Sequence, residues 1–257
     1  MNNHRDRVQI ASAFSLAALL IGIPVSDARA DEPSPDTATS QSMEQLIEQY
    51  ILTHPEVIEQ SLQALEAKRQ EEEKQRVRAA LATRQNDLLH DPSSPVSGNL
   101  NGEITMVEFF DYRCGYCKRA AAAVTQVQKD DPRVRVVYKD FPILGEPSEM
   151  AAKAALASRA QGKHQAFHEA LLAAKGDMTK ETILAVAGEV GLDPRLLEAD
   201  MANPEWQAVI DRNRALAKDL GITGTPGFIV GTELVPGALD VNGLKDLIAR
   251  AGIPKRP

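Results

Sequence analysis

The spacing of apolar residues changes along the chain, and the first regular pattern lies between residues 42 and 90. Apolar residues recur at helical spacing over 43–51 and again over 57–65, and the two runs are separated by LTHPEV, where a proline favours a break. The sequence AKRQEEEKQRVR, residues 67–78, has almost no apolar face. We therefore predict helices over 42–90 whose apolar faces meet copies of themselves in an oligomer, with 67–78 as a stalk. The alternative is a solvated helix packed at one end on the main domain.

A second pattern, which follows a linker predicted at DPSSPVSGN, is that of an α/β domain over residues 91–257. The β-branched and aromatic runs ITMVEFF and RVRVVYKDF predict strands, with a helix from CKRAAAAVTQVQ between them. About five helical segments are predicted over roughly 147–220. The chain then returns to strands in GFIVGTELV, with a hairpin turn at Gly231 and Thr232, and ends in a helix at VNGLKDLIARAG. The prediction is an α/β domain interrupted by a helical insertion.

The N-terminus has the pattern of a secretory signal peptide. A charged start, MNNHRDR, precedes an apolar stretch over 8–25, and Ala28-Arg29-Ala30 has the form of a cleavage site. The stretch is short for a membrane-spanning helix, which disfavours an uncleaved anchor. We therefore predict that residues 1–30 are removed, that the protein is exported to the periplasm, and that the polar residues 31–41 form a disordered leader.

The charge of the chain disfavours one class of partner. The predicted signal contains three arginines and two aspartates, so the 29 basic and 36 acidic residues of the whole chain become 26 and 34 after cleavage, a net charge of −8. An acidic protein is poorly suited to the phosphate backbone of nucleic acids, so no nucleic-acid partner is expected.

Cys114 and Cys117 are the only cysteines in the 257 residues, and they stand where the helix after the first strand should begin. Zinc needs four ligands, and neither a second cysteine pair nor a well-placed histidine pair accompanies them. His164 and His168 fit the face and core of an alanine-rich helix better than a metal site. A structural disulfide between residues three apart would close too small a loop to stabilise the fold much. The spacing favours thiol-disulfide exchange, in which the dithiol itself is the redox group and no metal or other cofactor is expected.

The two cysteines should have different roles in this exchange. The N-terminus of a helix presents unpaired N–H groups and the positive end of the helix dipole, which favour a thiolate over a thiol. We therefore predict that Cys114 attacks a substrate disulfide and that Cys117, one helical turn further on, resolves the mixed disulfide. Gly115 and Tyr116 complete the active-site motif between them.

Glu108 is an acidic residue within an apolar strand, six residues before Cys114. Strand alternation could simply point its side chain to solvent. The functional alternative, which we predict, is that Glu108 lies buried beneath the site with a raised pKa and accepts the proton of Cys117 during resolution. Lys139, on the neighbouring strand, is then a candidate charge partner.

Three features together resemble the DsbA family of exported thiol-disulfide oxidoreductases: the motif FFDYRCGYC, the helical insertion and the motif TGTPGF. The resemblance covers roughly residue 95 to the C-terminus and implies a thioredoxin-like fold. It implies that Pro226 follows a cis peptide bond and lies against Cys114, and that the backbone of Thr225 binds substrate as an added strand. It also implies that Glu108 is the buried acid of the family.

The residues around the site depart from DsbA itself, which has Pro-His between its cysteines and a valine before the cis-proline. Gly115-Tyr116 and Thr225 resemble instead the dimeric isomerase DsbC, and the loss of the histidine implies a less oxidising couple. The N-terminal helices resemble those of the trimeric suppressor-of-copper-sensitivity C proteins.

These resemblances imply a homo-oligomeric isomerase, most simply a trimer, that acts on misfolded exported proteins. A membrane reductase similar to DsbD or ScsB would keep it reduced. Two alternatives stay open: a disulfide-forming oxidase with a DsbB-like partner, and a Cu(I)-binding module, since soft thiolates select Cu(I).

Overall fold

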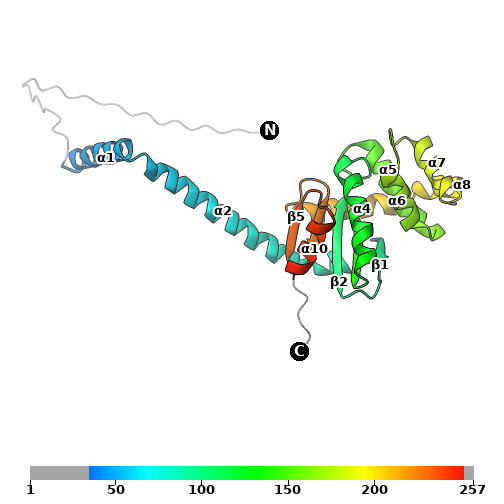
Figure 1. Cartoon of the computed structure of the whole chain (residues 1–257). Coiled ribbons are helices and arrows are strands. Elements are labelled where there is room, and N and C mark those ends of the chain that lie inside the picture. Colours follow the sequence, from blue (N-terminus) through cyan, green and yellow to red (C-terminus); the bar gives the residue numbers. More distant parts are fainter. Residues whose placement is uncertain (1–34, 252–257) are drawn as a thin grey trace, which may run out of the picture. The chain divides into compact units, whose positions relative to one another are not determined.

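The structure, a computed structural model of the chain, describes residues 35–251. The predicted signal peptide lies outside these residues. The described chain divides into an N-terminal unit that ends at Gln63 and a C-terminal unit that begins at Ala64 (Figure 1). Within the described residues, every helix is too short or too polar to cross a membrane.

The N-terminal unit contains α1 (Pro35–Thr53) and the start of α2 (Glu56–Thr83). The two helices separate at the predicted break, because Pro55 cannot donate the backbone hydrogen bond that a continuous helix would need. The expectation of a disordered leader is wrong for residues 35–41, which form the first turns of α1. Proline is well tolerated in a first helical turn, where the missing N–H would be unpaired in any case, so this polar segment can be helical.

The apolar side chains of the N-terminal unit are exposed in the described single chain. Met43, Leu46, Ile47 and Tyr50 of α1 are between 52% and 64% exposed, and Leu62 of α2 is 61% exposed. The four residues of α1 recur at spacings of three and four, so they form one stripe along that helix. The predicted apolar faces are therefore present and, within the single chain, uncovered.

The described part of the C-terminal unit is built on a five-stranded sheet with the order β1-β3-β2-β4-β5. The central strands β2 (Ile104–Phe110) and β3 (Val134–Asp140) are parallel and are joined by α4 (Gly115–Asp130), whereas all other neighbouring strands are antiparallel. The remaining strands and the closing helix are β1 (Val96–Gly98), β4 (Gly227–Val230), β5 (Glu233–Pro236) and α10 (Val241–Arg250). Gly231, at φ +60°, begins the predicted two-residue turn between β4 and β5.

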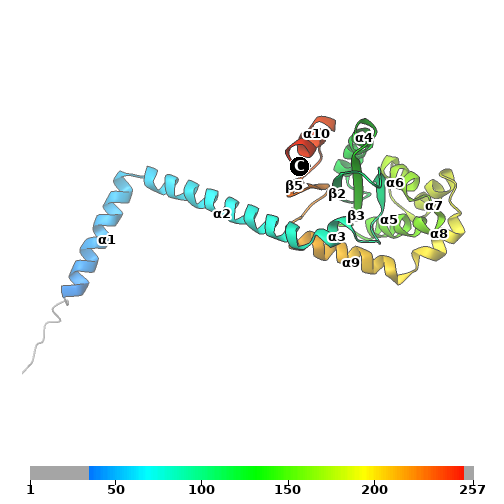
Figure 2. The ribbon, with the colours of Figure 1, turned by 90° about the horizontal axis from the view of Figure 1, so that it is seen from below.

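Helices cover both faces of this sheet, as Figure 2 shows. On one face, Met106, Phe110 and Phe228 pack in a core with residues of α4, α10 and the insertion. On the other face, Phe109 packs in a second core with the last turns of α2, α3 (Gln85–Leu89) and α9 (Pro204–Asp219). Because both faces are covered, the central strands carry nearly continuous apolar sequences.

The helical insertion lies between β3 and β4, as the sequence predicts. Its helices in the described chain are α5 (Glu146–Ala157), the 3-10 turn η1 (Ser158–Gln161), α6 (His164–Ala173), α7 (Lys180–Glu189), α8 (Pro194–Met201) and α9. Thr179, Asp193 and Asn203 cap three of them by accepting backbone hydrogen bonds from the first turn. The predicted number of about five α-helical segments agrees with this arrangement.

The C-terminal unit begins at Ala64, so the predicted boundary between residues 90 and 91 is not the boundary that the structure shows. Leu81 at the end of α2 and Leu88 of α3 are each only 2% exposed and belong to the second core of the sheet. The predicted linker also contains a strand, since β1 pairs with β3 along Val96–Gly98. The burial of two leucines outweighs the polar composition of the segment around them.

Candidate active site

The two cysteines lie where the chain leaves β2 and begins α4. Cys114 is the N-cap residue of α4, and its backbone N–H donates to the carbonyl of Asp111, 3.1 Å away. The Asp111 carboxylate accepts hydrogen bonds from the backbone N–H groups of Arg113 (2.8 Å), Ile143 (2.8 Å) and Leu144 (3.0 Å). Asp111 therefore ties the cysteine-bearing turn to the loop after β3, and fixes the position of Cys114.

Cys114 lies against the loop that precedes β4. Its Sγ atom is 3.3 Å from the carbonyl oxygen of Thr225, 111 residues further along the chain, and its side chain is only 7% exposed. The Thr225–Pro226 peptide bond is cis, as the resemblance implied. The Pro226 carbonyl accepts a hydrogen bond from Gly237 N–H at 2.8 Å, which links this loop to the chain after β5.

Cys117 lies inside α4 and is fully buried. Burial raises the pKa of its thiol far above the ordinary value, and negative charges on Cys114 and Glu108 raise it further, while hydrogen bonds with Asp111 and Thr225 act in the opposite direction. The thiol of Cys117 therefore needs a nearby group that takes its proton before it can act as a nucleophile.

Glu108 is buried in β2, and its side chain does not point to solvent. Burial raises the pKa of its carboxyl to about 8, and the Oε1 atom is buried without a hydrogen-bond partner in the described chain. Glu108 alternates with Met106 and Phe110 along β2, and those two residues pack in the same core as Cys117, so the Glu108 side chain points to the face of the sheet that carries Cys117. A carboxyl group with such a pKa can both accept and donate a proton near neutral pH.

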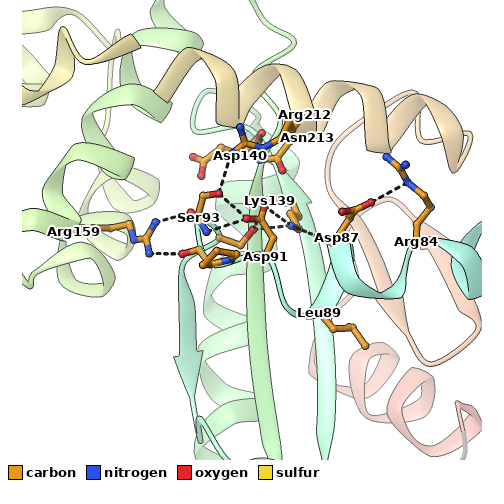
Figure 3. A network of polar contacts seen from close by, with 12 residues as sticks. Arg84, Asp87, Leu89, Asp91, Ser93, Lys139, Asp140, Arg159, Arg212 and Asn213 are labelled. Carbon is orange, nitrogen blue, oxygen red and sulfur yellow. Dashed lines mark hydrogen bonds and ion pairs between the residues drawn. The ribbon is translucent and has the colours of Figure 1, made fainter. Parts of the chain in front are cut away.

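The predicted pairing of Glu108 with Lys139 is wrong. In the parallel register Glu108 lies beside Tyr138, and Phe109 lies beside Lys139, so the two ionisable side chains are on opposite faces of the sheet. The Lys139 ammonium donates instead to the carbonyl of Asp87 (2.5 Å) and the hydroxyl of Ser94 (2.6 Å) (Figure 3). It also contacts the Asp91 carboxylate at 3.3 Å.

Figure 3 shows that Lys139 belongs to a wider polar network. In this network Arg159 of η1 and Arg212 of α9 contact the segment after α3. Arg159 donates to the carbonyls of Pro92 and Ser93, and Arg212 donates to the Ser93 hydroxyl. Although burial raises the pKa of Asp91, hydrogen bonds from Ser93 and the charge of Lys139 hold it below its ordinary value. This network holds the segment between α3 and β1 against the sheet and does not reach the cysteines.

Sequence reasoning missed a buried acid at the end of β3. Asp140 is 1% exposed, both of its carboxylate oxygens are buried without a partner in the described chain, and burial raises its pKa to about 8. It also missed Asp111, although an aspartate directly after a buried strand is a signal for a turn that binds backbone N–H groups.

The two histidines of the insertion are buried or nearly so, as predicted. The His168 Nδ1 atom is 2.9 Å from the hydroxyl of Tyr112, two residues before Cys114, so the pair joins the cysteine-bearing turn to α6. Burial lowers the pKa of His164 to about 3 and that of His168 well below its ordinary value, so both are neutral. Among residues 35–251, no group of three or more histidine, cysteine, aspartate or glutamate side chains is arranged to hold a metal ion.

A thioredoxin-like sheet, a dithiol at the start of the helix after its central strand, and a cis-proline against the first sulfur define a class of thiol-disulfide exchange proteins. The model of the DSBA-like thioredoxin domain matches residues 105–249, and the chain belongs to this family. Residues 41–72 match the model of the copper resistance protein ScsC N-terminal domain.

Solved structures agree with this assignment. A thioredoxin-like oxidoreductase from Silicibacter pomeroyi DSS-3 is 49% identical and covers 65% of this chain and 96% of its own, with a TM-score of 0.63. The catalytic domain of Proteus mirabilis ScsC is 27% identical and covers 68% of this chain and 97% of its own, with a TM-score of 0.63.

A curated relative, Na(+)/H(+) antiporter NhaA 1 of Salinispora arenicola, is 28% identical over 166 residues, which are 63% of this chain and 26% of the antiporter. The chain therefore spans about a quarter of the length of that relative.

Proposed function

We propose that the protein is a periplasmic thiol-disulfide oxidoreductase that acts mainly as a disulfide isomerase on misfolded exported proteins. The observation that carries the proposal is the position of Cys114, at the N-terminus of α4 with its sulfur 3.3 Å from the Thr225 carbonyl at the cis-proline. A client that pairs with the Thr225 backbone as an added strand would bring its disulfide to this sulfur.

Exchange begins when the Cys114 thiolate attacks one sulfur of the client disulfide. A bond forms between Cys114 and that sulfur, the client S–S bond breaks, and the other client sulfur leaves as a thiolate that takes a proton. In isomerisation a different client thiolate then attacks the mixed disulfide, so Cys114 is released and no electrons are transferred overall. In reduction Cys117 attacks instead, which leaves the enzyme oxidised to a Cys114–Cys117 disulfide and the client reduced by two electrons.

Glu108 serves the step in which Cys117 attacks. The buried Cys117 thiol must lose a proton, and the ionised Glu108 carboxyl accepts it. When a membrane reductase returns the enzyme to the dithiol form, the protonated carboxyl gives the proton back. A pKa of about 8 suits both directions, since neither form is rare near neutral pH.

The isomerase direction is supported by the motif and by the N-terminal unit. Gly115-Tyr116 lacks the histidine that would further stabilise a thiolate and make the couple more oxidising. The match to the ScsC N-terminal domain and the uncovered apolar stripe of α1 support a homo-oligomer, which we propose is a trimer. Several linked sites raise the effective concentration for repeated attack on one client.

The proposal includes a DsbD- or ScsB-like membrane reductase as redox partner; an oxidase would use a DsbB-like partner. The redox state in the periplasm distinguishes them: a mostly reduced dithiol supports the isomerase, and a mostly oxidised one supports the oxidase. The segment matched to the ScsC N-terminal domain contains no cysteine, so a Cu(I) role would depend on Cys114 and Cys117. Copper titration into the reduced protein tests it.

The roles of the two cysteines are tested by serine variants. Cys114→Ser should abolish exchange, whereas Cys117→Ser should still attack and accumulate mixed disulfides, because only resolution is lost. Non-reducing electrophoresis after reaction with a scrambled client measures the trapped species. Equal trapping by both variants would contradict the assignment.

The role of the N-terminal unit is tested in the full chain. Leu46→Glu combined with Leu62→Glu should yield a monomer in sedimentation, because charges in an apolar interface are costly. The same charges at the neighbouring polar positions Gln45 and Gln60 are the control. The monomer should still reduce a small disulfide but reshuffle a scrambled protein poorly. A wild-type protein that sediments as a monomer, or a monomeric variant with full isomerase activity, would remove this part of the proposal.

A further inference from the structure

A groove of about 900 Å³ lies beside the cis-proline, within the C-terminal unit. Tyr116 and Arg119 of α4 line it, together with residues 221–227 and the β4–β5 hairpin. The last turns of α2, from Glu73 to Arg78, also contribute to its lining. The helix that continues from the N-terminal unit therefore forms part of the surface next to the dithiol.

The α2 wall of the groove is fixed to the sheet. Leu81 is buried in the second core, and Val77 packs against the same core. Arg76, directly before Val77, donates to the carbonyl of Asp219 at 3.1 Å. Asp219 lies two residues before Gly221. Gly221 has φ +73°, a backbone conformation that favours glycine, and a Cβ atom there would lie 2.7 Å from the Arg76 guanidinium, which would have to move. The backbone of residues 73–78 thus has a defined position relative to the cis-proline loop.

The charges that line the groove are not balanced. Its two acids are each paired with an arginine: Glu73 with Arg76 at 2.6 Å, and Glu233 with Arg250 at 3.3 Å. Within the described chain, Lys74 and Arg78 make no hydrogen bond or ion pair, and Arg119 only stacks on the ring of Tyr116, at 4.2 Å. The groove therefore presents three unpaired cations.

Apolar surface lies between these cations. Val77, Ile222, Pro226 and Leu234 line the same groove. A ligand that matches the groove would have apolar side chains for this surface and carboxylates for the cations.

We propose that the groove selects client segments in which acidic and apolar residues flank the disulfide-bonded cysteine, and that Lys74 and Arg78 of α2 determine this specificity. The inference rests on the proposed function, because that function brings an extended client to the cis-proline loop. The inference adds that two cations of α2 select clients by their charge. The helix that leads from the N-terminal unit would then contribute directly to client binding.

The experiment compares two short peptides that differ only in the residues beside one cysteine, glutamates in one and lysines in the other. Each is supplied to the full-length mature protein as a disulfide with the same small thiol. Attack by Cys114 on the peptide sulfur releases that thiol, and the ratio of the two exchange rates is measured. The wild type should prefer the acidic peptide, and Lys74→Glu with Arg78→Glu should lower the ratio by about tenfold or more, since two exposed charges are reversed. The preference should shrink at high salt.

The matched control reverses two charges further back on α2, Lys68→Glu with Arg69→Glu, at positions that do not line the groove. This control should keep the wild-type ratio. Equal rates for both peptides in the wild type, or an unchanged ratio in the groove variant, would overturn the inference.

A redox-inert version of each peptide, with serine for cysteine, distinguishes failure of this inference from failure of the proposed function. Its affinity for the wild type and the groove variant reports charge selection without any exchange. A wild type that exchanges with no disulfide but binds the acidic peptide about tenfold more tightly than the basic one would refute the function and support the groove. Equal affinities would refute the groove whatever the exchange assay shows.

Discussion

Glu108 of β2 and Lys139 of β3 are buried on opposite faces of the same sheet, and their surroundings differ. The Lys139 ammonium has three oxygen partners, one of them a carboxylate. Glu108 has an oxygen without a partner in the described chain, and burial raises its pKa to about 8. A buried charge with partners holds parts of the fold together, whereas a buried acid without a charge partner keeps a proton that chemistry can use.

Lys139 and Glu108 also serve different purposes on the two faces of the sheet. Lys139 holds the segment between α3 and β1, which must cross the face of the sheet with few apolar residues of its own. Glu108 alternates with Met106 and Phe110 and so lies on the face that carries Cys117, where a cation beside it would hold its pKa low. A lysine partner for Glu108 would therefore work against proton transfer near neutral pH.

The largest effect is expected for Lys139→Met. The substitution leaves the Asp91 carboxylate, the Ser94 hydroxyl and the Asp87 carbonyl without their shared donor, and should lower the free energy of unfolding by about 3 kcal/mol. Urea unfolding measures the loss. Lys129→Met, at an exposed position near the end of α4, is the control and should change stability by less than about 0.5 kcal/mol. Equal stability of the two variants would mean that the network does not hold the fold.

A second effect is expected for Glu108→Gln, in catalysis. Glutamine fills the same space but cannot accept the proton of Cys117, so resolution of a mixed disulfide by Cys117 should slow by about 100-fold. Rapid-quench measurement of released client gives this rate. Initial attack by Cys114 should change much less.

Asp140→Asn is the matched control for that variant, because it neutralises another buried acid whose pKa is about 8. Asp140 lies at the end of β3, beside Phe110 in the register, whereas Glu108 lies within β2, two positions earlier. Resolution by Asp140→Asn should therefore stay within about threefold of the wild type, a small fraction of a general acid-base effect. If both variants slow resolution equally, the effect comes from buried charge in general and not from proton transfer by Glu108.

Much of the C-terminal unit could be predicted because its local signals agree with its tertiary contacts. The run ITMVEFF is β-branched and aromatic and forms β2 over the predicted residues, and Gly231 occupies the predicted hairpin turn. The dithiol could be predicted from its spacing and its place between a strand and a helix. The cis bond before Pro226 came from family resemblance.

The remaining features depend on information that a single sequence does not contain. Both faces of β2 and β3 are covered, so the apolar runs show no alternation, and the faces of Glu108 and Lys139 could not be assigned. Strand β1 is three residues long within a segment rich in proline and serine, and its pairing with β3 depends on tertiary contact. The polar composition of α2 likewise hid the burial of Leu81.

The smallest effect is the pH dependence of stability. In the unfolded chain Glu108 and Asp140 lose their protons near their ordinary pKa values of 4.5 and 3.8, whereas the folded protein keeps them up to about pH 8. Because the folded state binds more protons in this window, the contribution of these two acids to stability should be highest below their unfolded pKa values and fall as pH rises toward 8. Each acid contributes a slope of at most about 1.4 kcal/mol per pH unit.

The window from about pH 6.5 to 8 shows this effect as a difference between the wild type and the variants. His164 and His168 have lowered pKa values in the folded protein, so they add stability as pH rises through their unfolded value of 6.5, but the wild type and the variants share this contribution. Urea unfolding of the reduced protein across this window should show a shallower slope for Glu108→Gln and, by the same reasoning, for Asp140→Asn. A Glu108→Gln slope equal to that of the wild type would mean that Glu108 is already ionised in the folded protein, and the contrast with Lys139 would then lose its basis.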